Sequence, residues 1–289
     1  MSKKELRQRL EALGARAVWA LFAALPLDIA SGLGGWLGRA VGPWLGGVNR
    51  TARKNLKAAF PDRSEAEVTA IIRAMWDNIG RVAGEFPHLK RIAAERVELV
   101  GGEYIDLLRD DGKPGIFISA HLGNWEIGGA VAALHGLALH VVYRAANNPH
   151  VEEIYRKARA SATTTMIPKG PEGARQAMAV LRQGGHLGML VDQKMNDGVP
   201  IPFFGRDAMT APAQAAFATK FKCPLAPIRV ERVKGAHFRV TVSPPLDLPH
   251  TGDTHHDRRL LLTRINALLE EWIRERPEQW LWVHRRWPE

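Results

Sequence analysis

Residues 118–129 contain the two side chains whose types and spacing point most directly to chemistry, His121 and Glu126. A histidine beside a carboxylate forms a general-base pair: the carboxylate fixes the tautomer, and the imidazole takes a proton from a hydroxyl. If the acceptor hydroxyl itself attacks, no serine, cysteine or threonine nucleophile is needed. The alternative is a histidine that only ends a core strand, with its ring in a hydrogen bond.

The five-residue spacing of this pair limits the backbone between them. On one helix the two side chains would diverge by about 140°, and on one strand they would face opposite ways. They can meet only if the chain turns, which Gly123 permits. We therefore expect a buried strand over 115–120 and a helix that starts near Asn124, a good N-cap residue. Such strand ends are where open α/β sheets bind ligands.

The surrounding pattern predicts an α/β fold with a mixed sheet flanked by helices. Ser64 and Glu67 form a candidate capping box for a helix over 64–86. Further helices are expected over 125–135, 149–161, 171–183, 210–221 and 257–275. Strands are expected over 95–100, 115–120, 137–144, 186–193, 225–232 and 237–243, and the closing stretch 279–286 reads as a strand.

The N-terminal region is the candidate membrane-associated part. A basic amphipathic helix over 3–13 precedes an apolar stretch over 17–38 that could cross a bilayer but is interrupted by Pro26 and Asp28. A signal peptide, a buried helical hairpin and a membrane-embedded or membrane-lying anchor are the alternatives. We favour the anchor, because Trp19, Trp36 and Trp44 suit a membrane interface. This predicts a helical membrane-associated region over 1–60 and an α/β domain over 61–289.

The net charge of +10 and the pI of about 10.0 favour an anionic partner. No nucleic-acid motif is present, so we expect no nucleic-acid partner. Arg50, Arg53, Lys54 and Lys57 have the spacing of one helix face. That stripe indicates either a solvated face or a surface for anionic lipid headgroups.

The sequence predicts neither a metal site nor a cofactor. Cys223 is the only cysteine, which excludes an intramolecular disulfide and a Cys-based zinc cage, and its apolar context predicts a buried thiol. The run His255-His256-Asp257 has no third ligand at a suitable spacing and is expected to be a surface loop. No phosphate-binding loop or dinucleotide fingerprint is present.

Several stretches together resemble one enzyme family. HLGNWE at 121–126 resembles the H-x4-D/E signature of glycerolipid and lipid A acyltransferases. The stretches at 54–62, 143–159, 189–193, 202–205 with Thr210, and 277–287 resemble other blocks of the late acyltransferases of bacterial lipid A biosynthesis, the lauroyl and myristoyl transferases. Ala145 departs from the proline that relatives often have. The blocks span most of the chain in order.

The resemblance implies an enzyme at the bacterial inner membrane, with its active site facing the cytoplasm. It implies acyl carrier protein thioesters as donors, inner membrane lipids as surroundings, and a Kdo-bearing lipid A precursor as acceptor. The hydroxyl of a 3-hydroxyacyl chain on that precursor would receive the acyl group. His121 would be the general base and Glu126 would orient it.

The resemblance also suggests substrate-binding residues. Arg159 is the candidate to bind a phosphate or hold an oxyanion, Arg144 is a second candidate, and a solvated arginine is the alternative. Asp192, at the end of a predicted strand, should lie near the site unless it only caps a helix or loop. Arg285 and Arg286 could bind acceptor phosphates, or could be a solvated terminal charge run.

Other functions remain open at this point. A glycerolipid or lysophospholipid acyltransferase would use the same signature. A thioesterase would replace the lipid hydroxyl with water, and a non-catalytic basic membrane-binding protein would not need His121. The sequence does not reveal the acyl-chain length, the acylated hydroxyl, the order of acylation or the oligomeric state.

Overall fold

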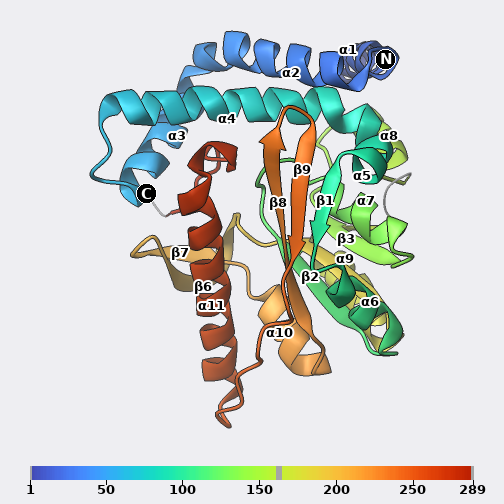
Figure 1. Ribbon diagram of the computed structural model, residues 1–289, viewed down its shortest axis with the longest axis vertical. Helices are drawn as coiled ribbons and strands as arrows, with labels where there is room; N and C mark the ends of the chain where they lie inside the picture. Colours follow the sequence, from blue (N-terminus) through green and yellow to red (C-terminus); the bar gives the residue numbers. More distant parts are fainter. Residues whose placement is uncertain (1, 161–164, 288–289) are drawn as a thin grey trace.

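The computed structural model describes residues 2–160 and 165–287. Its centre is a seven-stranded sheet in the order β1-β9-β8-β2-β5-β3-β4 (Figure 1). All neighbouring strands are parallel except β8 and β9, which form an antiparallel hairpin. The prediction of a mixed sheet flanked by helices is confirmed. The strands are β1 (Val97–Val100), β2 (Gly115–Ser119), β3 (Leu139–Tyr143), β4 (Thr165–Pro168), β5 (His186–Leu190), β8 (Leu225–Lys234) and β9 (His237–Val242).

Strand β2 is central because its side chains are apolar on both faces. Ile116 and Ile118 belong to one core cluster, while Phe117 points into the other. Helices α9 (Pro171–Arg182), α10 (Ala213–Phe221) and α11 (Thr254–Glu275) contribute to the first cluster. Helices α5 (Leu89–Glu95), α6 (Gly102–Asp110) and α7 (Ile127–Leu134) contribute to the second. The continuous apolar run of β2 is thus explained by burial from two sides.

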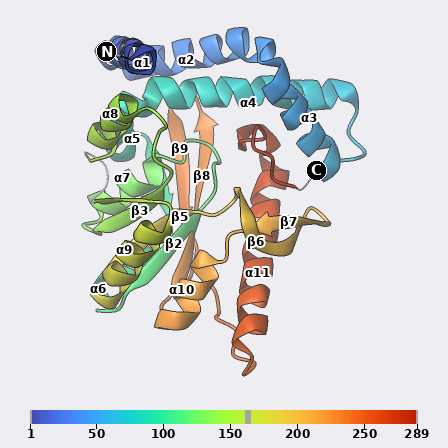
Figure 2. The same ribbon diagram turned by 180° about the vertical axis from the view of Figure 1, so that it is seen from behind.

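The N-terminal helices form a layer across one end of the sheet (Figures 1 and 2). They are α1 (Lys3–Ala24), α2 (Leu27–Val41), the 3-10 turn η1 (Gly42–Trp44), α3 (Gly46–Ala59) and α4 (Glu65–Glu85). The capping box of Ser64 and Glu67 at the start of α4 is confirmed. Helix α2 lies along α4 so closely that a Cβ on Gly34 would be 2.3 Å from the carbonyl oxygen of Gly80. Glycine is required there for the two backbones to approach.

The N-terminal layer carries exposed apolar side chains. Trp36 is 57% exposed and Trp44 is 86% exposed. Leu6, Leu10, Leu13, Val18, Leu21, Ile29, Leu37, Val41 and Leu45 are also exposed. Within residues 2–160 and 165–287, no helix is both long enough and apolar enough to span a bilayer. Membrane association of this region therefore stays a prediction, as does the domain boundary at residue 60.

The strand expected over 279–286 is wrong. The structure has the 3-10 turn η3 (Pro277–Gln279) followed by irregular chain, with one isolated bridge between Leu122 and Trp280. The alternation that suggested a strand arises because Trp280 and Trp282 are buried against the hairpin of β6 (Lys194–Phe203) and β7 (Arg206–Thr210). The buried Asn55 side chain donates to the carbonyl oxygens of Trp282 and His284, so a side chain replaces a partner strand.

Candidate active site

The predicted site residues converge because parallel strands end at one edge of the sheet. Ser119, the last residue of β2, pairs with Leu190, the last residue of β5. His121 follows β2 and Asp192 follows β5, so both side chains lie at this edge. Arg144 directly follows β3. The expectation that Asp192 lies near the site is met, since its carboxylate contacts His121.

The chain turns sharply between His121 and Glu126, as predicted. Gly123 has φ +57°, and a Cβ there would be 2.5 Å from the carbonyl oxygen of Val230. A side chain at this position is excluded both by conformation and by space. Helix α7 starts at Ile127, two to three residues later than expected. Asn124 is not its N-cap, which is Glu126; the Asn124 side-chain oxygen accepts from the Glu126 backbone N–H at 3.3 Å, just before the helix starts.

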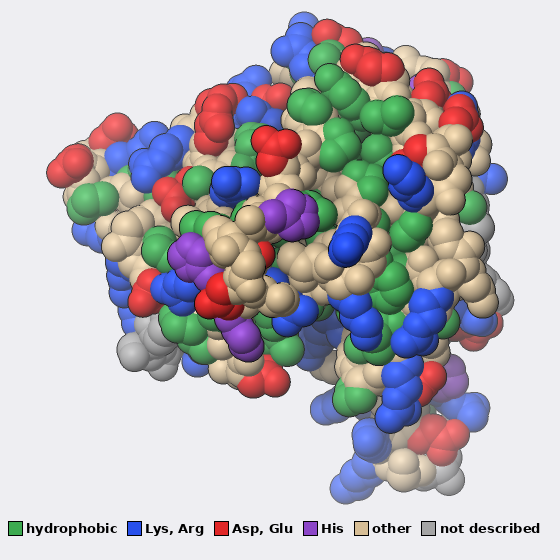
Figure 3. Space-filling model, turned by 90° about the horizontal axis from the view of Figure 1, so that it is seen from below, with side chains coloured by type: hydrophobic (Ala, Val, Ile, Leu, Met, Phe, Trp, Pro, Cys, Tyr) green, Lys and Arg blue, Asp and Glu red, His purple; other side chains and the backbone are tan. Residues whose placement is uncertain are grey.

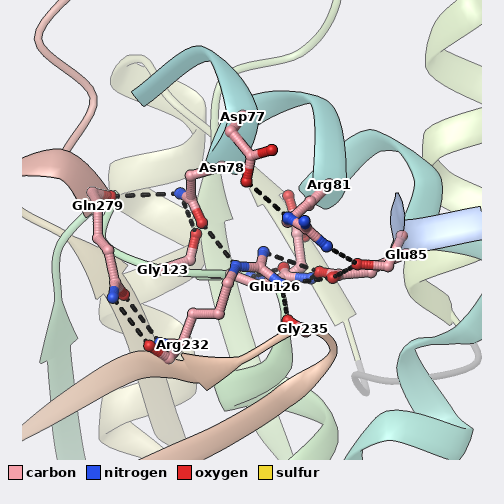
Figure 4. A network of polar contacts seen from close by, with 11 residues as sticks. Asp77, Asn78, Arg81, Glu85, Gly123, Glu126, Arg232, Gly235 and Gln279 are labelled. Atoms are coloured by element: carbon pink, nitrogen blue, oxygen red, sulfur yellow. Dashed lines mark hydrogen bonds and ion pairs between the residues drawn. The ribbon is translucent and has the colours of Figure 1, made fainter. Parts of the chain in front are cut away.

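A buried polar network holds this turn in place (Figure 4). Asn78 donates to the carbonyl oxygen of Gly123 at 2.9 Å, and Asn124 donates to Glu85 at 2.9 Å. Glu85 forms an ion pair with Arg232, which also donates to Asn78 at 2.9 Å. Glu85 is fully buried. The turn is therefore attached to α4 and to the β8–β9 hairpin at the same time.

Asp192 is the carboxylate that holds the His121 ring. Its Oδ1 lies 2.8 Å from His121 Nδ1, and its Oδ2 accepts from the backbone N–H of His121 at 3.0 Å and from Trp280 Nε1 at 2.8 Å. Burial alone would raise the pKa of Asp192, but the contacts with His121 and Trp280 outweigh it and keep the pKa below its usual value. An ionised Asp192 accepts a hydrogen bond from Nδ1–H, which leaves His121 Nε2 as the basic nitrogen.

Gln193 joins the two histidines of the site. Its side-chain nitrogen is 3.1 Å from His121 Nε2 and 2.8 Å from His284 Nε2. One amide NH2 can donate to both nitrogen lone pairs only if neither ring carries a proton on Nε2. Burial, with the nearby His121, lowers the pKa of His284 and favours its neutral form. A substrate hydroxyl that approaches His121 Nε2 must therefore displace Gln193.

Glu126 contacts Arg159, not His121. The guanidinium of Arg159 meets the Glu126 carboxylate through two bonds, Nε–Oε2 at 2.8 Å and Nη2–Oε1 at 2.6 Å. Burial would lower the pKa of Arg159, but the bonds to Glu126 raise it above its usual value. Arg159, the candidate for binding a phosphate or an oxyanion, therefore lies directly beside Glu126. The orienting contact to His121 that the sequence suggested for Glu126 comes from Asp192 instead.

A cavity of about 240 Å³ adjoins His121. The polar residues that line it are His121, Glu126, Arg144, Arg159, Lys169, Gln193 and His284; Arg144 and Lys169 are exposed, so this side forms the mouth. The apolar part of the lining includes Phe117, Leu139, Val141, Met166, Met189 and Ile228, of which Phe117, Leu139 and Ile228 are buried. Gly128, in the first turn of α7, leaves space there, since a Cβ would be 3.9 Å from its nearest neighbour, Ile228. The arrangement suits an apolar chain with a reacting group at its polar end.

Two residues that line the cavity, Lys169 and His284, were not predicted from the sequence to lie there. Lys169 follows the short strand β4, which the pattern analysis missed. Burial and the charge of Arg144 lower the pKa of Lys169, while Asp192 raises it. His284 directly precedes the two terminal arginines, and the sequence predicts no place in the cavity for it. The signal that could have found Lys169 is its position directly after a strand that ends at the active edge.

The two predicted terminal arginines have different surroundings. Arg286 is 1% exposed and donates to the Met209 carbonyl oxygen and the Thr210 hydroxyl. Burial lowers the pKa of Arg286 to about 10. Its placement supports a role in packing the C-terminal segment. Arg285 is exposed and lines a separate surface hollow.

The remaining candidate groups do not add a metal or a nucleophile. Cys223 is buried, as predicted, and burial raises the pKa of its thiol to about 11. His255, His256 and Asp257 lie in the first turn of α11, so the expected surface loop is wrong; Asp253 caps this helix. In the part of the chain that the structure describes, no three His, Cys, Asp or Glu side chains are grouped to hold a metal ion.

Comparison with known proteins places this geometry in a family. The family model described as bacterial lipid A biosynthesis acyltransferase matches residues 3–289. The chain is 24% identical to the lipid A biosynthesis palmitoleoyltransferase of Escherichia coli (strain K12), over 94% of this chain and 89% of that protein. It is 26% identical to the myristoyltransferase of that organism, over 86% and 77%, and 23% identical to its lauroyltransferase, over 95% and 90%. The chain therefore belongs to the bacterial lipid A biosynthesis acyltransferase family.

Proposed function

We propose that the chain transfers a lauroyl- or myristoyl-class acyl group from an acyl carrier protein thioester to a lipid hydroxyl. The acceptor is the hydroxyl of a 3-hydroxyacyl chain on a Kdo-bearing lipid A precursor. Membership in the family supports acyl transfer in lipid A biosynthesis. The observation that carries the proposal is the imidazole of His121, held by Asp192 at the mouth of an apolar cavity.

The reaction begins at His121 Nε2. With Nδ1–H donating a hydrogen bond to Asp192, Nε2 removes the proton from the acceptor hydroxyl as its oxygen attacks the thioester carbonyl carbon. The tetrahedral intermediate then collapses, the carbon–sulfur bond breaks, and the imidazolium returns the proton to the leaving thiolate. Asp192 stabilises the positive imidazolium between these two steps. The products are the new ester and the free thiol of the donor.

The Glu126–Arg159 pair supplies charge beside this reaction. The guanidinium lies at the cavity mouth, 2.6–2.8 Å from the carboxylate that fixes it. A fixed cation near the thioester carbonyl favours the negative charge that develops on its oxygen. Arg144 and Lys169 add positive charge at the same mouth and are the candidates to bind anionic parts of the substrates.

Two properties of the protein surface, its exposed apolar side chains and its positive charge, support the proposed membrane attachment and the proposed donor. The exposed apolar side chains of α1, α2 and η1 support attachment to the inner membrane, with the active site facing the cytoplasm. Lys and Arg side chains are numerous on the face shown in Figure 3. A net charge of +10 suits an acidic carrier protein as donor.

The proposal is tested by incubating the purified protein with lauroyl or myristoyl carrier protein and a Kdo-bearing tetraacyl precursor. Mass spectrometry should show a gain of one acyl chain. His121→Ala should lower the rate by about 10²–10⁴-fold, while His255→Ala, an exposed histidine on α11, should not.

Three other outcomes would redirect the assignment. Acyl release without a lipid acceptor would indicate a thioesterase. Transfer to a lysophospholipid but not to the lipid A precursor would indicate a glycerolipid acyltransferase. No reaction with any donor, from folded membrane-bound protein, would favour a non-catalytic membrane-binding protein.

A further inference from the structure

A second hollow lies outside the active-site cavity, between α3 and the C-terminal segment. It has a volume of about 440 Å³ and is open to solvent. Gly47, Arg50, Thr51 and Lys54 form one wall, at the spacing of a single helix face. Val283 and Arg285 form the opposite wall. Two segments more than 200 residues apart in sequence thus bring three cations around one space, and none of the described residues that line it is acidic.

The basic stripe of α3 is divided in the structure. Arg53 and Lys57 both form ion pairs with Glu65, so their charges are partly compensated by one shared carboxylate. Arg50 and Lys54 have no ion pair among the described residues, and both are exposed at the hollow. Charge that is uncompensated on one side of the helix and compensated on the other indicates an anion site rather than a uniformly solvated face.

The C-terminal wall of the hollow is fixed before any ligand binds. Asn55, next to Lys54 on α3, donates to the carbonyl oxygens of Trp282 at 2.7 Å and of His284 at 2.5 Å. Arg286 and Trp282 are buried on either side of Val283 and Arg285. These anchors hold the backbone of Arg285 against α3. Binding an anion there therefore requires ordering of side chains only.

The hollow is close to the reacting centre. Arg285 directly follows His284, whose ring centroid is 5.9 Å from that of His121. The same stretch of chain thus lines both spaces, His284 the cavity and Val283 with Arg285 the hollow. An acceptor that binds across this stretch contacts both.

We propose that this hollow binds a phosphate group of the lipid acceptor through Arg50, Lys54 and Arg285. Arginine matches two phosphate oxygens at once, lysine adds a point charge, and the Thr51 hydroxyl can donate a further bond. A phosphate held here orients the acceptor so that its hydroxyl-bearing chain faces His121. The inference rests on the proposed acyl transfer to a phosphorylated lipid.

The test compares variants with equal charge loss on the same helix. Arg50→Gln with Lys54→Gln removes the cations of the hollow, and Arg53→Gln with Lys57→Gln removes the two that pair with Glu65. With the phosphorylated acceptor, the first pair should raise KM by about threefold to tenfold per residue, with little change in kcat. With a dephosphorylated acceptor the same pair should have no effect. The control pair should change KM by no more than about twofold with either the phosphorylated or the dephosphorylated acceptor.

A binding measurement without catalysis separates this inference from the proposed function. Inorganic pyrophosphate is titrated calorimetrically into the full chain in detergent. We expect binding that weakens with salt, is lost in the first pair and is kept in the control. That result without any acyl transfer would remove the proposed function and leave the hollow as a phosphate site. If acyl transfer is intact but pyrophosphate does not bind and the first variant pair leaves KM unchanged, only the proposal that the hollow is a phosphate site is overturned.

Vesicle binding distinguishes the acceptor phosphate from membrane headgroups. Both variant pairs could equally reduce the amount of protein recovered with phosphatidylglycerol vesicles and equally raise KM. In that case the basic stripe of α3 acts as a general surface for anionic membranes, and the proposal is wrong. If only the first pair raises KM while both bind vesicles like the parent protein, the phosphate assignment stands.

Discussion

Asp192 carries the most specific prediction at the scale of single residues. Asp192→Asn keeps an oxygen that can accept from His121 Nδ1 but removes the charge that stabilises the imidazolium. We expect kcat to fall by about 10²–10⁴-fold. The melting temperature should fall as well, because the new amide NH2 would face the His121 backbone N–H and Trp280 Nε1, two buried donors that now bind Asp192 Oδ2. Asp207→Asn, an exposed residue of β7, is the matched control. If Asp192→Asn retains activity within about threefold, the orienting carboxylate must be another group, with Glu126 the first to test.

His284 predicts how stability depends on pH. Its pKa is lowered in the folded protein, whereas the unfolded chain has a pKa near 6.5. Below about pH 6.5 the unfolded state binds a proton that the folded state does not, so stability falls as pH decreases toward the folded pKa. Urea unfolding at pH 7.5 and 5.5 should show this loss, and His284→Gln should reduce it. An identical loss in that variant would assign the effect to other groups.

The sequence identified most residues of the site but not their pairing. His121 and Glu126 could be proposed from their types and spacing, Asp192 from its place at the end of a predicted strand, and Arg159 only from the family resemblance. The partner of His121 could not be predicted, because it depends on strand order. Asp192 reaches His121 only because β5 is the neighbour of β2, although 71 residues separate the two side chains.

At the scale of elements, helix α7 contributes Gly128 and Gly129 to the lining of the cavity in which we propose that the acyl chain lies. Gly128→Met places a side chain into the cavity, where only Ile228 is near. We expect the ratio of lauroyl to myristoyl transfer to rise by about tenfold or more, since each methylene in an apolar pocket changes discrimination by that order. Gly128→Ala, which adds one methyl group, should give a smaller change. If the ratio of lauroyl to myristoyl transfer is unchanged in both variants, the acyl chain does not lie against Gly128.

Elements with strong periodicity were predictable and those with weak patterns were not. The apolar run of β2 and the capped start of α4 are local signals that agree with the fold. Strand β6 contains two prolines and a glycine, so it lacks strand signals and was missed. The segment 279–286 has a period of two, yet its tryptophans are buried by aromatic packing and not by a sheet.

At the scale of the whole molecule, the apolar side chains of the N-terminal layer predict membrane attachment. Replacing Trp36 and Trp44 by serine should lower vesicle partitioning by about tenfold or more per residue. The melting temperature should change little, because both side chains are largely exposed. Leu107→Ser, on α6 and 54% exposed, is the control. Equal recovery of all variants with vesicles would exclude this layer as the attachment surface.

The network around Glu85 and Arg232 has a consequence for local motion. Opening the turn at Gly123 would break the buried bonds from Asn78 to the Gly123 carbonyl oxygen and from Asn124 to Glu85, at a cost of about 1–3 kcal/mol for each buried polar group left unpaired. The active-site backbone should therefore not open locally at a free energy well below that of global unfolding. Its amides should exchange with deuterium at the free energy of global unfolding, and activity should disappear in urea together with the fold.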